Sequence, residues 1–166
     1  RNDGEVHPGV DLRKGSLKQE YVLKGNRMYD QICEELDVPF RRCGQYVGFT
    51  QWRYLPVIFL YVLEKKYRCK VKDTRLVGRK AFRRAEPELN PDFKFAIYNP
   101  GAGCVCPYGL TIAYGENAVE NGARISLNTA VSDMEVKGGI IQCVHTNRGS
   151  IYPSLVINAA GTFAED

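Results

Sequence analysis

The stretch LVINAAG, residues 155–161, carries the clearest indication of fold class in this sequence. Leu155, Val156 and Ile157 are consecutive apolar residues, which is typical of a strand buried on both faces in a parallel sheet. The small residues that follow would let a ligand approach the backbone at the carboxyl end of the strand, where open parallel sheets bind ligands. The segment therefore predicts an α/β fold with a ligand site at this junction. A tight strand–helix turn without a ligand has the same pattern.

The residues before this junction alternate between helix and strand patterns. A helix is predicted over 107–121, because Pro107 suits its first turn and Gly122 suits a left-handed terminus. The alternation over 125–129 predicts a half-buried strand. Strands over 140–146 and 150–152 come next, with turns at Lys137-Gly138-Gly139 and Asn147-Arg148-Gly149, before the strand at 155–157.

The first hundred residues contain further helices and strands. Apolar residues at three- and four-residue spacing predict a helix over 17–36, with Ser16 as its N-cap and Tyr21 and Met28 on its buried face. The other predicted elements are a strand over 41–50, a helix over 56–67, a helix over 80–85 and a strand over 93–98.

Length and composition indicate one globular domain, or one and a fraction. The chain has 166 residues, of which 44% are hydrophobic and 25% charged, so wholesale disorder is excluded. The longest apolar run, over 54–63, is too short to span a membrane and contains Pro56. Because the sequence starts at Arg1 rather than at a methionine, we expect a piece of a longer protein.

The net charge of +4 is unevenly distributed, because basic residues crowd the stretch Lys65–Arg84. Such a stretch can bind an anionic surface, but a solvated helix–loop–helix face is an equally simple interpretation. No nucleic-acid-binding signature accompanies it, so we predict no nucleic-acid partner.

Six cysteines lie at 33, 43, 69, 104, 106 and 143, without zinc spacing, and we predict no metal site. We interpret them as reduced, mostly buried thiols of an intracellular protein. Cys104 and Cys106 are interpreted as alternating strand residues. The segment 101–106 imitates the start of a dinucleotide-binding fingerprint, but its sixth position is cysteine and the next strand offers no acidic residue for a ribose.

Several segments taken together resemble the FAD-dependent oxidoreductases of the D-amino-acid-oxidase-like superfamily, in particular the glycerol-3-phosphate dehydrogenase and L-2-hydroxyglutarate oxidase branch. The similarity is carried, in order along the chain, by NDGEVHPGVD (2–11), KGSLKQEYVLKGNRMYDQICEELDVPFRRCGQYVGF (14–49), EPELNPDF (86–93), CPYGLTIAYGENAVENGA (106–123) and VINAAGTFAED (156–166). Each motif is weak alone, and the set is specific.

The resemblance implies an α+β (α/β) architecture with interleaved domains. Residues 1–14 would form a flavin-adjacent segment and residues 15–101 a substrate domain with a mixed sheet. Residues 102–166 would form part of a Rossmann-like FAD-binding domain that lacks its N-terminal βαβ unit. That unit carries the glycine fingerprint that holds the pyrophosphate. We therefore expect this piece alone to bind FAD weakly or not at all.

The resemblance also implies site residues. The cofactor-binding positions would be Asn2, Gly4 and His7 beside the isoalloxazine ring, Val131 against the adenine, and Ala160 and Gly161 near the ribose and pyrophosphate. His7 is the catalytic candidate, as a base or an orienting group, because imidazole exchanges protons near neutral pH. Arg42 and Tyr46 are the substrate-binding candidates. Arginine would suit an anionic substrate, although Arg41 and Arg42 also fit a solvated strand edge.

The implied function is oxidation of glycerol 3-phosphate to dihydroxyacetone phosphate by hydride transfer to FAD. One alternative is an FAD-dependent 2-hydroxyacid (L-2-hydroxyglutarate) or amino-acid oxidase. Another is a non-catalytic domain that binds an anionic surface through Lys65–Arg84. We expect a small anionic substrate as partner, with contact to a membrane or a quinone-type electron acceptor as a further expectation for the longer protein. The expected location is cytoplasmic, or peripheral to the inner face of the membrane.

Overall fold

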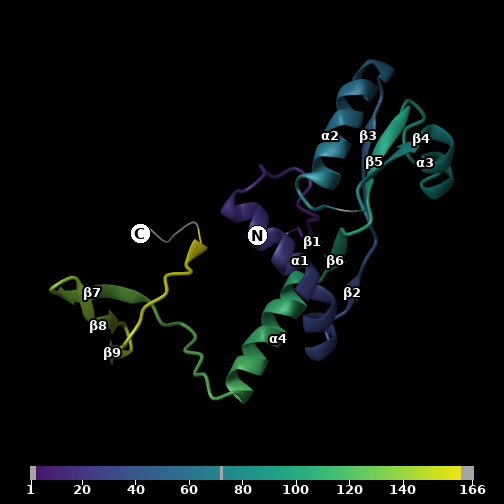
Figure 1. Cartoon of the computed structure of the whole chain (residues 1–166). Helices are drawn as coiled ribbons and strands as arrows, with labels where there is room; N and C mark the ends of the chain where they lie inside the picture. Colours follow the sequence, from purple (N-terminus) through teal and green to yellow (C-terminus); the bar gives the residue numbers. More distant parts are fainter. Residues whose placement is uncertain (1–2, 72, 162–166) are drawn as a thin grey trace. The chain divides into compact units, whose positions relative to one another are not determined.

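A computed structural model describes residues 3–71 and 73–161. The chain divides into two compact units, Arg1–Asn121 and Gly122–Asp166. The elements are helices and short antiparallel strands (Figure 1), so the predicted mixture of α and β structure is confirmed. The division after residue 121 follows from which residues contact one another. The domain boundary after residue 101, which the family resemblance implies, stays a prediction.

The first unit contains two small antiparallel sheets. One has the strand order β1-β6-β2, formed by Glu5–Val6, Gly103–Val105 and Phe40–Arg41. The other has the order β3-β5-β4, formed by Gln45–Phe49, Phe95–Asn99 and Arg75–Gly78. The helices are α1 (Leu17–Glu35), α2 (Leu55–Tyr67), α3 (Arg79–Ala85) and α4 (Pro107–Glu120), with a short 3₁₀ turn, η1 (Trp52–Tyr54), before α2.

The helix ends follow the sequence signals. The Ser16 side chain accepts a hydrogen bond from the Gln19 amide and caps α1 as predicted. Gly122 has a φ of 90°, the predicted left-handed conformation after α4. The buried face predicted for α1 is only partly right. Cys33 is buried, but Tyr21 and Met28 are 66% and 53% exposed, so the buried face does not include them.

The strand predicted over 41–50 is in fact two strands, β2 and β3, which belong to different sheets. Gly44 lies between them with a φ of 74°, a conformation that ends an extended strand and that glycine adopts without strain. A Cβ atom at Gly44 would lie 2.7 Å from the Tyr98 ring. The chain therefore turns at Gly44 and continues in the second sheet.

The core of the first unit is centred on β5 and on the loop after β1. Phe95, Ala96 and Ile97 of β5 are buried beneath the helices that pack on the sheet. Val10 packs with Cys69 and Val71, and the Tyr61 hydroxyl of α2 donates a hydrogen bond to the Val10 carbonyl at 2.7 Å. These contacts fix the segment that follows β1 against α2.

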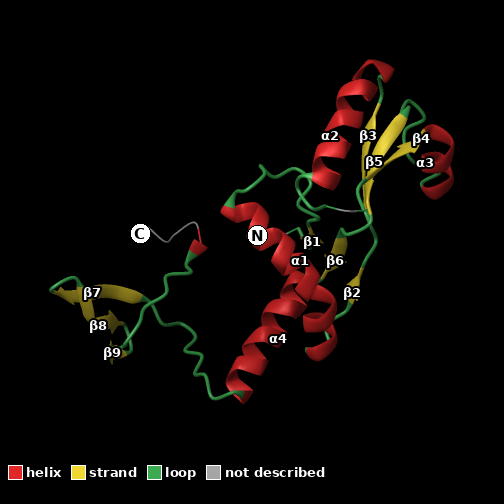
Figure 2. Cartoon of the chain, in the orientation of Figure 1, coloured by secondary structure: helices red, strands yellow, loops and turns green. Residues whose placement is uncertain are grey.

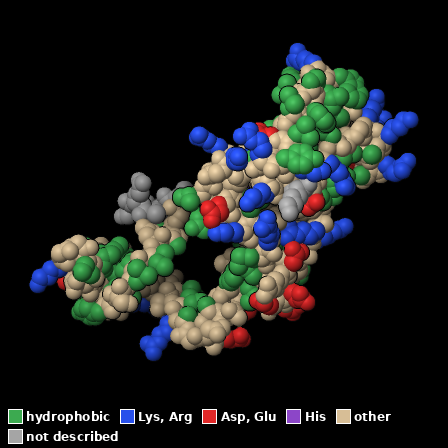
Figure 3. Space-filling view, in the orientation of Figure 1, with side chains coloured by type: hydrophobic (Ala, Val, Ile, Leu, Met, Phe, Trp, Pro, Cys, Tyr) green, Lys and Arg blue, Asp and Glu red, His purple; other side chains and the backbone are tan. Residues whose placement is uncertain are grey.

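Helix α2 is apolar on its outer side as well. Its exposed side chains include Val57, Phe59 and Leu60, and Figure 3 shows hydrophobic atoms gathered over α2. Among the described residues, no helix is long and apolar enough to cross a membrane. In the basic stretch, most of the described lysines and arginines are exposed, but Lys65 is buried and donates to the Leu12 carbonyl at 2.8 Å.

The second unit is a three-stranded antiparallel meander of β7 (Val131–Lys137), β8 (Ile140–Thr146) and β9 (Gly149–Ile151). Gly138 and Gly139 both have positive φ, which confirms the predicted hairpin turn. The third strand was predicted over 150–152 and lies within one residue of that range.

Two predicted strands of this unit do not form (Figure 2): those over 125–129 and 155–157 have no strand structure. Leu155 and Ile157 are 75% and 80% exposed. A parallel strand needs a neighbour to satisfy its backbone groups, and every strand pair in the described part of the chain is antiparallel. The apolar pattern is present, but the partner strand that it requires is not.

Candidate functional site

His7 follows the last residue of β1, and its ring is within reach of a carboxylate. The Nδ1 atom of His7 lies 3.6 Å from Oε1 of Glu5, and half of the imidazole is exposed. Residues two apart along an extended chain point to the same side, which brings the two groups together. The ring is therefore partly open to solvent and has a carboxylate beside Nδ1.

A series of side-chain hydrogen bonds holds the Glu5 carboxylate in place. Gln45 Nε2 donates to Glu5 Oε1 at 2.6 Å, and Asn99 Nδ2 donates to Gln45 Oε1 at 3.2 Å. The series ends at Thr74, whose hydroxyl donates to Asn99 Oδ1 at 2.9 Å, and both of these side chains are buried. Buried polar groups that are satisfied in this way fix one another's orientation. The carboxylate beside His7 is thus held by groups from three strand regions.

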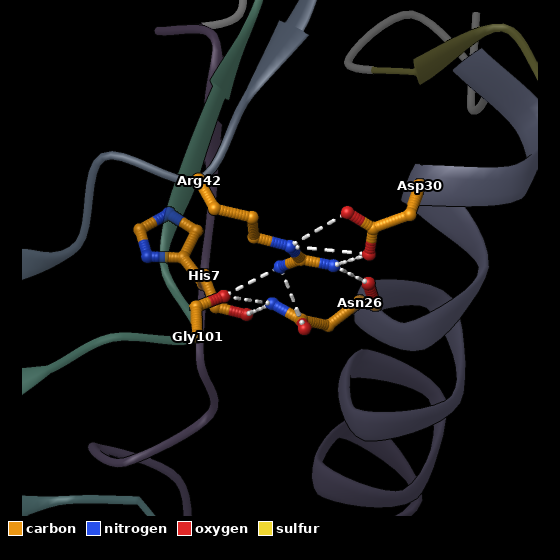
Figure 4. Close-up of polar contacts among 5 residues, drawn as sticks. All are labelled: His7, Asn26, Asp30, Arg42 and Gly101. Atoms are coloured by element: carbon orange, nitrogen blue, oxygen red, sulfur yellow. Dashed lines mark hydrogen bonds and ion pairs between the residues drawn. The ribbon is translucent and has the colours of Figure 1, made fainter. Parts of the chain in front are cut away.

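The predicted substrate residue Arg42 lies in a second network (Figure 4). Its guanidinium donates to Asp30 Oδ2 at 2.6 Å, to Asn26 Oδ1 at 3.0 Å, and to the carbonyls of Gly101 and Asn26 at 2.6 Å each. Asn26 Nδ2 also donates to the carbonyls of His7 and Gly101 at 2.9 Å each. His7 thus joins this network through its backbone, and not through its ring.

This geometry gives Arg42 a positioning role. Its side chain is only 26% exposed, so the solvated strand edge suggested for it is wrong, whereas Arg41 is exposed. The guanidinium has three nitrogens, and each of them donates a hydrogen bond: Nε to Asp30, and the two terminal nitrogens to the groups named above. The Arg42 hydrogen bond lowers the pKa of Asp30 below its ordinary value. Substrate binding by Arg42 stays a prediction, and the structure shows the arginine joining α1 to the Gly101 loop.

A cavity of about 410 Å³ lies beside the segment that follows His7. Pro8, Asn26 and Gly101 line it, together with the basic side chains Arg27 and Lys70. Its volume falls in the range of small-molecule sites, about 300–1,000 Å³. Two cations against the single acid Asp73 make this cavity suitable for a small anion. Lys70 belongs to the basic stretch Lys65–Arg84, but Arg27 was not predicted, because the two residues meet only in the fold.

The other predicted residues of the first unit have structural reasons for their identity. Gly4 is buried with a φ of 77°, and a Cβ there would lie 2.6 Å from the Val105 carbonyl oxygen. Tyr46 packs its ring against Tyr98 and Phe82, at centroid distances of 4.6 and 5.1 Å, and burial raises its pKa. It follows Gln45 along β3 and so points to the opposite face of the sheet. Asn2 lies outside the described residues.

In the second unit, two of the predicted cofactor positions line one cavity. Val131 begins β7, and Ala160 lies in the segment after the meander; both border a space of about 720 Å³. Gly161 follows directly with a φ of 68°. The lining is partly apolar, and the small side chains of Ala159 and Ala160 leave the backbone accessible. These features fit a flat aromatic base with a sugar attached, which is the adenosine part of FAD.

Glu5 and Gln45 are functional candidates that the sequence prediction missed. A signal for Glu5 was present, since it precedes His7 by only two residues. Gln45 carried no such signal, because it reaches Glu5 only through the packing of two separate sheets.

Comparison with known proteins supports the class that the sequence resemblance indicates, the FAD-dependent oxidoreductases. The family model described as "FAD dependent oxidoreductase" matches residues 1–166. A glycerol 3-phosphate dehydrogenase of Caloramator mitchellensis is 33% identical over 99% of this chain and 34% of its own length. A mitochondrial L-2-hydroxyglutarate dehydrogenase of Nematostella vectensis is 29% identical over 81% of this chain and 29% of its own length.

A solved structure shows the same fold. Glycine oxidase from Bacillus cereus superposes with a TM-score of 0.83 at 21% identity, over 98% of this chain and 46% of that chain. The chain spans about a third of the length of the relatives that it matches by sequence. Since the family model covers the whole sequence, the chain belongs to the FAD dependent oxidoreductase family.

Proposed function

We propose that the whole protein oxidises a small anionic secondary alcohol, glycerol 3-phosphate, to the ketone in an FAD-dependent reaction. The observation that carries this proposal is the 33% identity to a glycerol 3-phosphate dehydrogenase over 99% of the chain. The paired His7 and Glu5 supply the acid–base group that alcohol oxidation needs.

The cavity lined by Val131 and Ala160 would hold the adenosine part of FAD. The segment with Gly4 and His7 would lie against the flavin ring, as the family resemblance implies. FAD, when bound, accepts the hydride from the substrate carbon. The finer description, a substrate domain joined to part of a Rossmann-like domain, belongs to this proposal and rests on the family match over residues 1–166.

His7 would take the hydroxyl proton of the substrate at Nε2. Its Nδ1 stays beside Glu5 Oε1, so the carboxylate orients the ring and stabilises the imidazolium as it forms. Gln45 holds the same carboxylate oxygen at 2.6 Å and prevents it from turning away. Removal of the proton assists departure of the hydride from the neighbouring carbon.

The cavity beside Pro8 and Gly101 would bind the phosphate. Arg27 and Lys70 line it beside the acid Asp73, so the lining favours an anion. Both candidate substrates are anions, and we prefer glycerol 3-phosphate because its dehydrogenase is the relative with 33% identity.

An L-2-hydroxyglutarate substrate is the second candidate, because several relatives carry that name at 26–29% identity. The two are separated by anaerobic flavin reduction in the whole protein. We expect glycerol 3-phosphate to bleach the flavin absorbance and L-2-hydroxyglutarate to leave it unchanged. Bleaching by L-2-hydroxyglutarate alone would transfer the proposal to that substrate, and bleaching by neither would reject both.

The expected cytoplasmic or membrane-peripheral location and the contact with an electron acceptor remain proposals.

A further inference from the structure

Two cysteines that are far apart in the sequence meet on the surface of the first unit. The Sγ atoms of Cys43 and Cys104 lie 3.2 Å apart, although 61 residues separate them along the chain. Cys104 lies in β6, and Cys43 lies two residues after the end of the neighbouring strand β2. The Gly44 amide donates to the Ala102 carbonyl at 3.0 Å, which continues the pairing of the two segments. The two thiols are therefore held together by backbone pairing.

The remaining cysteines differ from this pair in exposure or in role. Cys33, Cys69 and Cys143 are buried, whereas Cys43 and Cys104 are exposed and can meet a soluble oxidant. Cys106 is also exposed, but its Sγ accepts a hydrogen bond from the Gly109 amide at 3.5 Å and caps α4. Among the described cysteines, Cys43 and Cys104 form the surface pair that is close enough to react.

We propose that Cys43 and Cys104 are a dithiol site that peroxides oxidise to a reversible intramolecular disulfide. The Cys43 thiolate attacks the peroxide, its sulfur is oxidised to the sulfenic acid, and the other oxygen leaves as hydroxide or alkoxide. The Cys104 thiol then displaces hydroxide from the sulfenic acid, which forms the S–S bond and releases water. Two thiols and one molecule of hydrogen peroxide thus give one disulfide and two molecules of water.

The local environment assigns the first step to Cys43. The hydrogen bond to Cys43 raises the pKa of the Cys104 thiol, so Cys104 keeps its proton and acts in the second step. Closing the bond requires the sulfurs to approach by about 1 Å, since a disulfide is about 2.05 Å long. Side-chain rotation supplies that movement without separation of the paired strands.

The disulfide would join two segments that carry the networks described above. Cys104 pairs with Glu5 on one side and with Arg41 on the other, and Cys43 directly follows Arg42. Oxidation would therefore clamp β6 to the segment that holds Arg42, next to the strand of Glu5. A cross-link between residues so distant in sequence restricts the unfolded chain and thereby stabilises the folded protein.

The test uses the whole protein, reduced and then treated with hydrogen peroxide. We expect peptide mapping of the wild type to show one cross-linked species that joins the peptides of Cys43 and Cys104, and dithiothreitol to reverse it. The melting temperature should rise by roughly 5–15 °C on oxidation. Cys43→Ser and Cys104→Ser should each abolish the cross-link. Cys106→Ser is the matched control, because serine keeps the cap of α4, and it should oxidise like the wild type.

Two results would overturn the proposal. One is a wild-type chain that keeps both thiols titratable after peroxide treatment while Cys106 reacts. The other is cross-linking that joins two chains instead of residues of one chain. Because peptide mapping is done on the wild type, the result does not depend on whether a variant folds.

Discussion

The Nδ1 atom of His7 lies 3.6 Å from Oε1 of Glu5, and the same carboxylate oxygen accepts a hydrogen bond from Gln45 at 2.6 Å. The His7 ring, which could accept a substrate proton, thus lies beside a carboxylate that the Gln45 hydrogen bond holds in one orientation. This arrangement makes Glu5 a positioning residue for His7, and it can be tested separately from His7.

Replacement Glu5→Gln should lower kcat about 10-fold in the whole protein and leave KM and flavin content nearly unchanged. Glutamine keeps the shape of the side chain but removes the charge that stabilises the imidazolium. Steady-state kinetics with glycerol 3-phosphate measure both constants. Glu88→Gln is the matched control, because it makes the same change at an exposed glutamate outside this cluster. A Glu5→Gln enzyme with wild-type kcat would show that the carboxylate does not act through His7.

Replacement Arg42→Ala should lower the free energy of unfolding by about 2–4 kcal/mol, because both oxygens of Asn26 lose their Arg42 donor and the Gly101 carbonyl keeps only Asn26 Nδ2. Arg42→Lys should recover only part of this loss, since an ammonium group lacks the planar fork. Urea denaturation measures the change, with the exposed neighbour Arg41→Ala as control, expected within ~0.5 kcal/mol of wild type. A stable Arg42→Ala chain with a raised KM would instead support the predicted substrate role.

The Arg42–Asp30 pair should make stability depend on pH at the acid end. The pKa of Asp30 is lowered in the folded chain from 3.8 by its hydrogen bond to Arg42. A lowered folded pKa means that the stabilisation is present above pH 3.8 and is lost as the pH falls through the folded value. Asp30 is 62% exposed, so solvent limits the effect to a few tenths of a kcal/mol.

Thermal unfolding between pH 6 and about 2.5 tests this expectation. Asp30→Asn should be slightly less stable than wild type at neutral pH, and the difference should vanish at the acid end. A difference that grows on acidification would contradict the assignment.

Replacement Ala160→Trp should fill the cavity that Val131 and Ala160 share, and should weaken FAD binding at least 10-fold in the whole protein. An indole ring there occupies the space that we assign to the adenosine. Ile140→Trp is the matched control, since Ile140 is exposed on β8 and does not line this cavity. Flavin content after purification and titration of the apoprotein with FAD measure the effect. Full FAD content in Ala160→Trp would place the cofactor elsewhere.

The sequence predicted the local features of this fold well. The Ser16 cap, the start of α4 at Pro107 and the Gly138–Gly139 hairpin all depend on residues next to one another in the chain. The apolar segments over 125–129 and 155–157 were assigned to strands wrongly. A strand depends on a partner that local pattern does not specify.

The candidate site shows the same limit. His7 was identified through a resemblance, and Glu5 lies close to it in sequence. Gln45, Asn99 and Thr74 come from separate strand regions, and only the packing of the two sheets brings them into one chain of hydrogen bonds. The contact of Cys43 with Cys104 is likewise absent from the sequence pattern. Cys104 and Cys106 were both interpreted as strand residues, but only Cys104 lies in β6, and Cys106 caps α4. Three of the six cysteines are exposed, so the expectation of mostly buried thiols holds only for the other three.

The most direct test of the account is the rate at which glycerol 3-phosphate bleaches the flavin of the whole protein without oxygen, in wild type and in His7→Gln. We expect the wild type to bleach. The variant should hold the same amount of FAD and bleach about 100-fold or more slowly, because the glutamine amide is not basic enough to take the hydroxyl proton. Equal rates in the two proteins, or a flavin-loaded wild type that glycerol 3-phosphate does not bleach, would contradict the account.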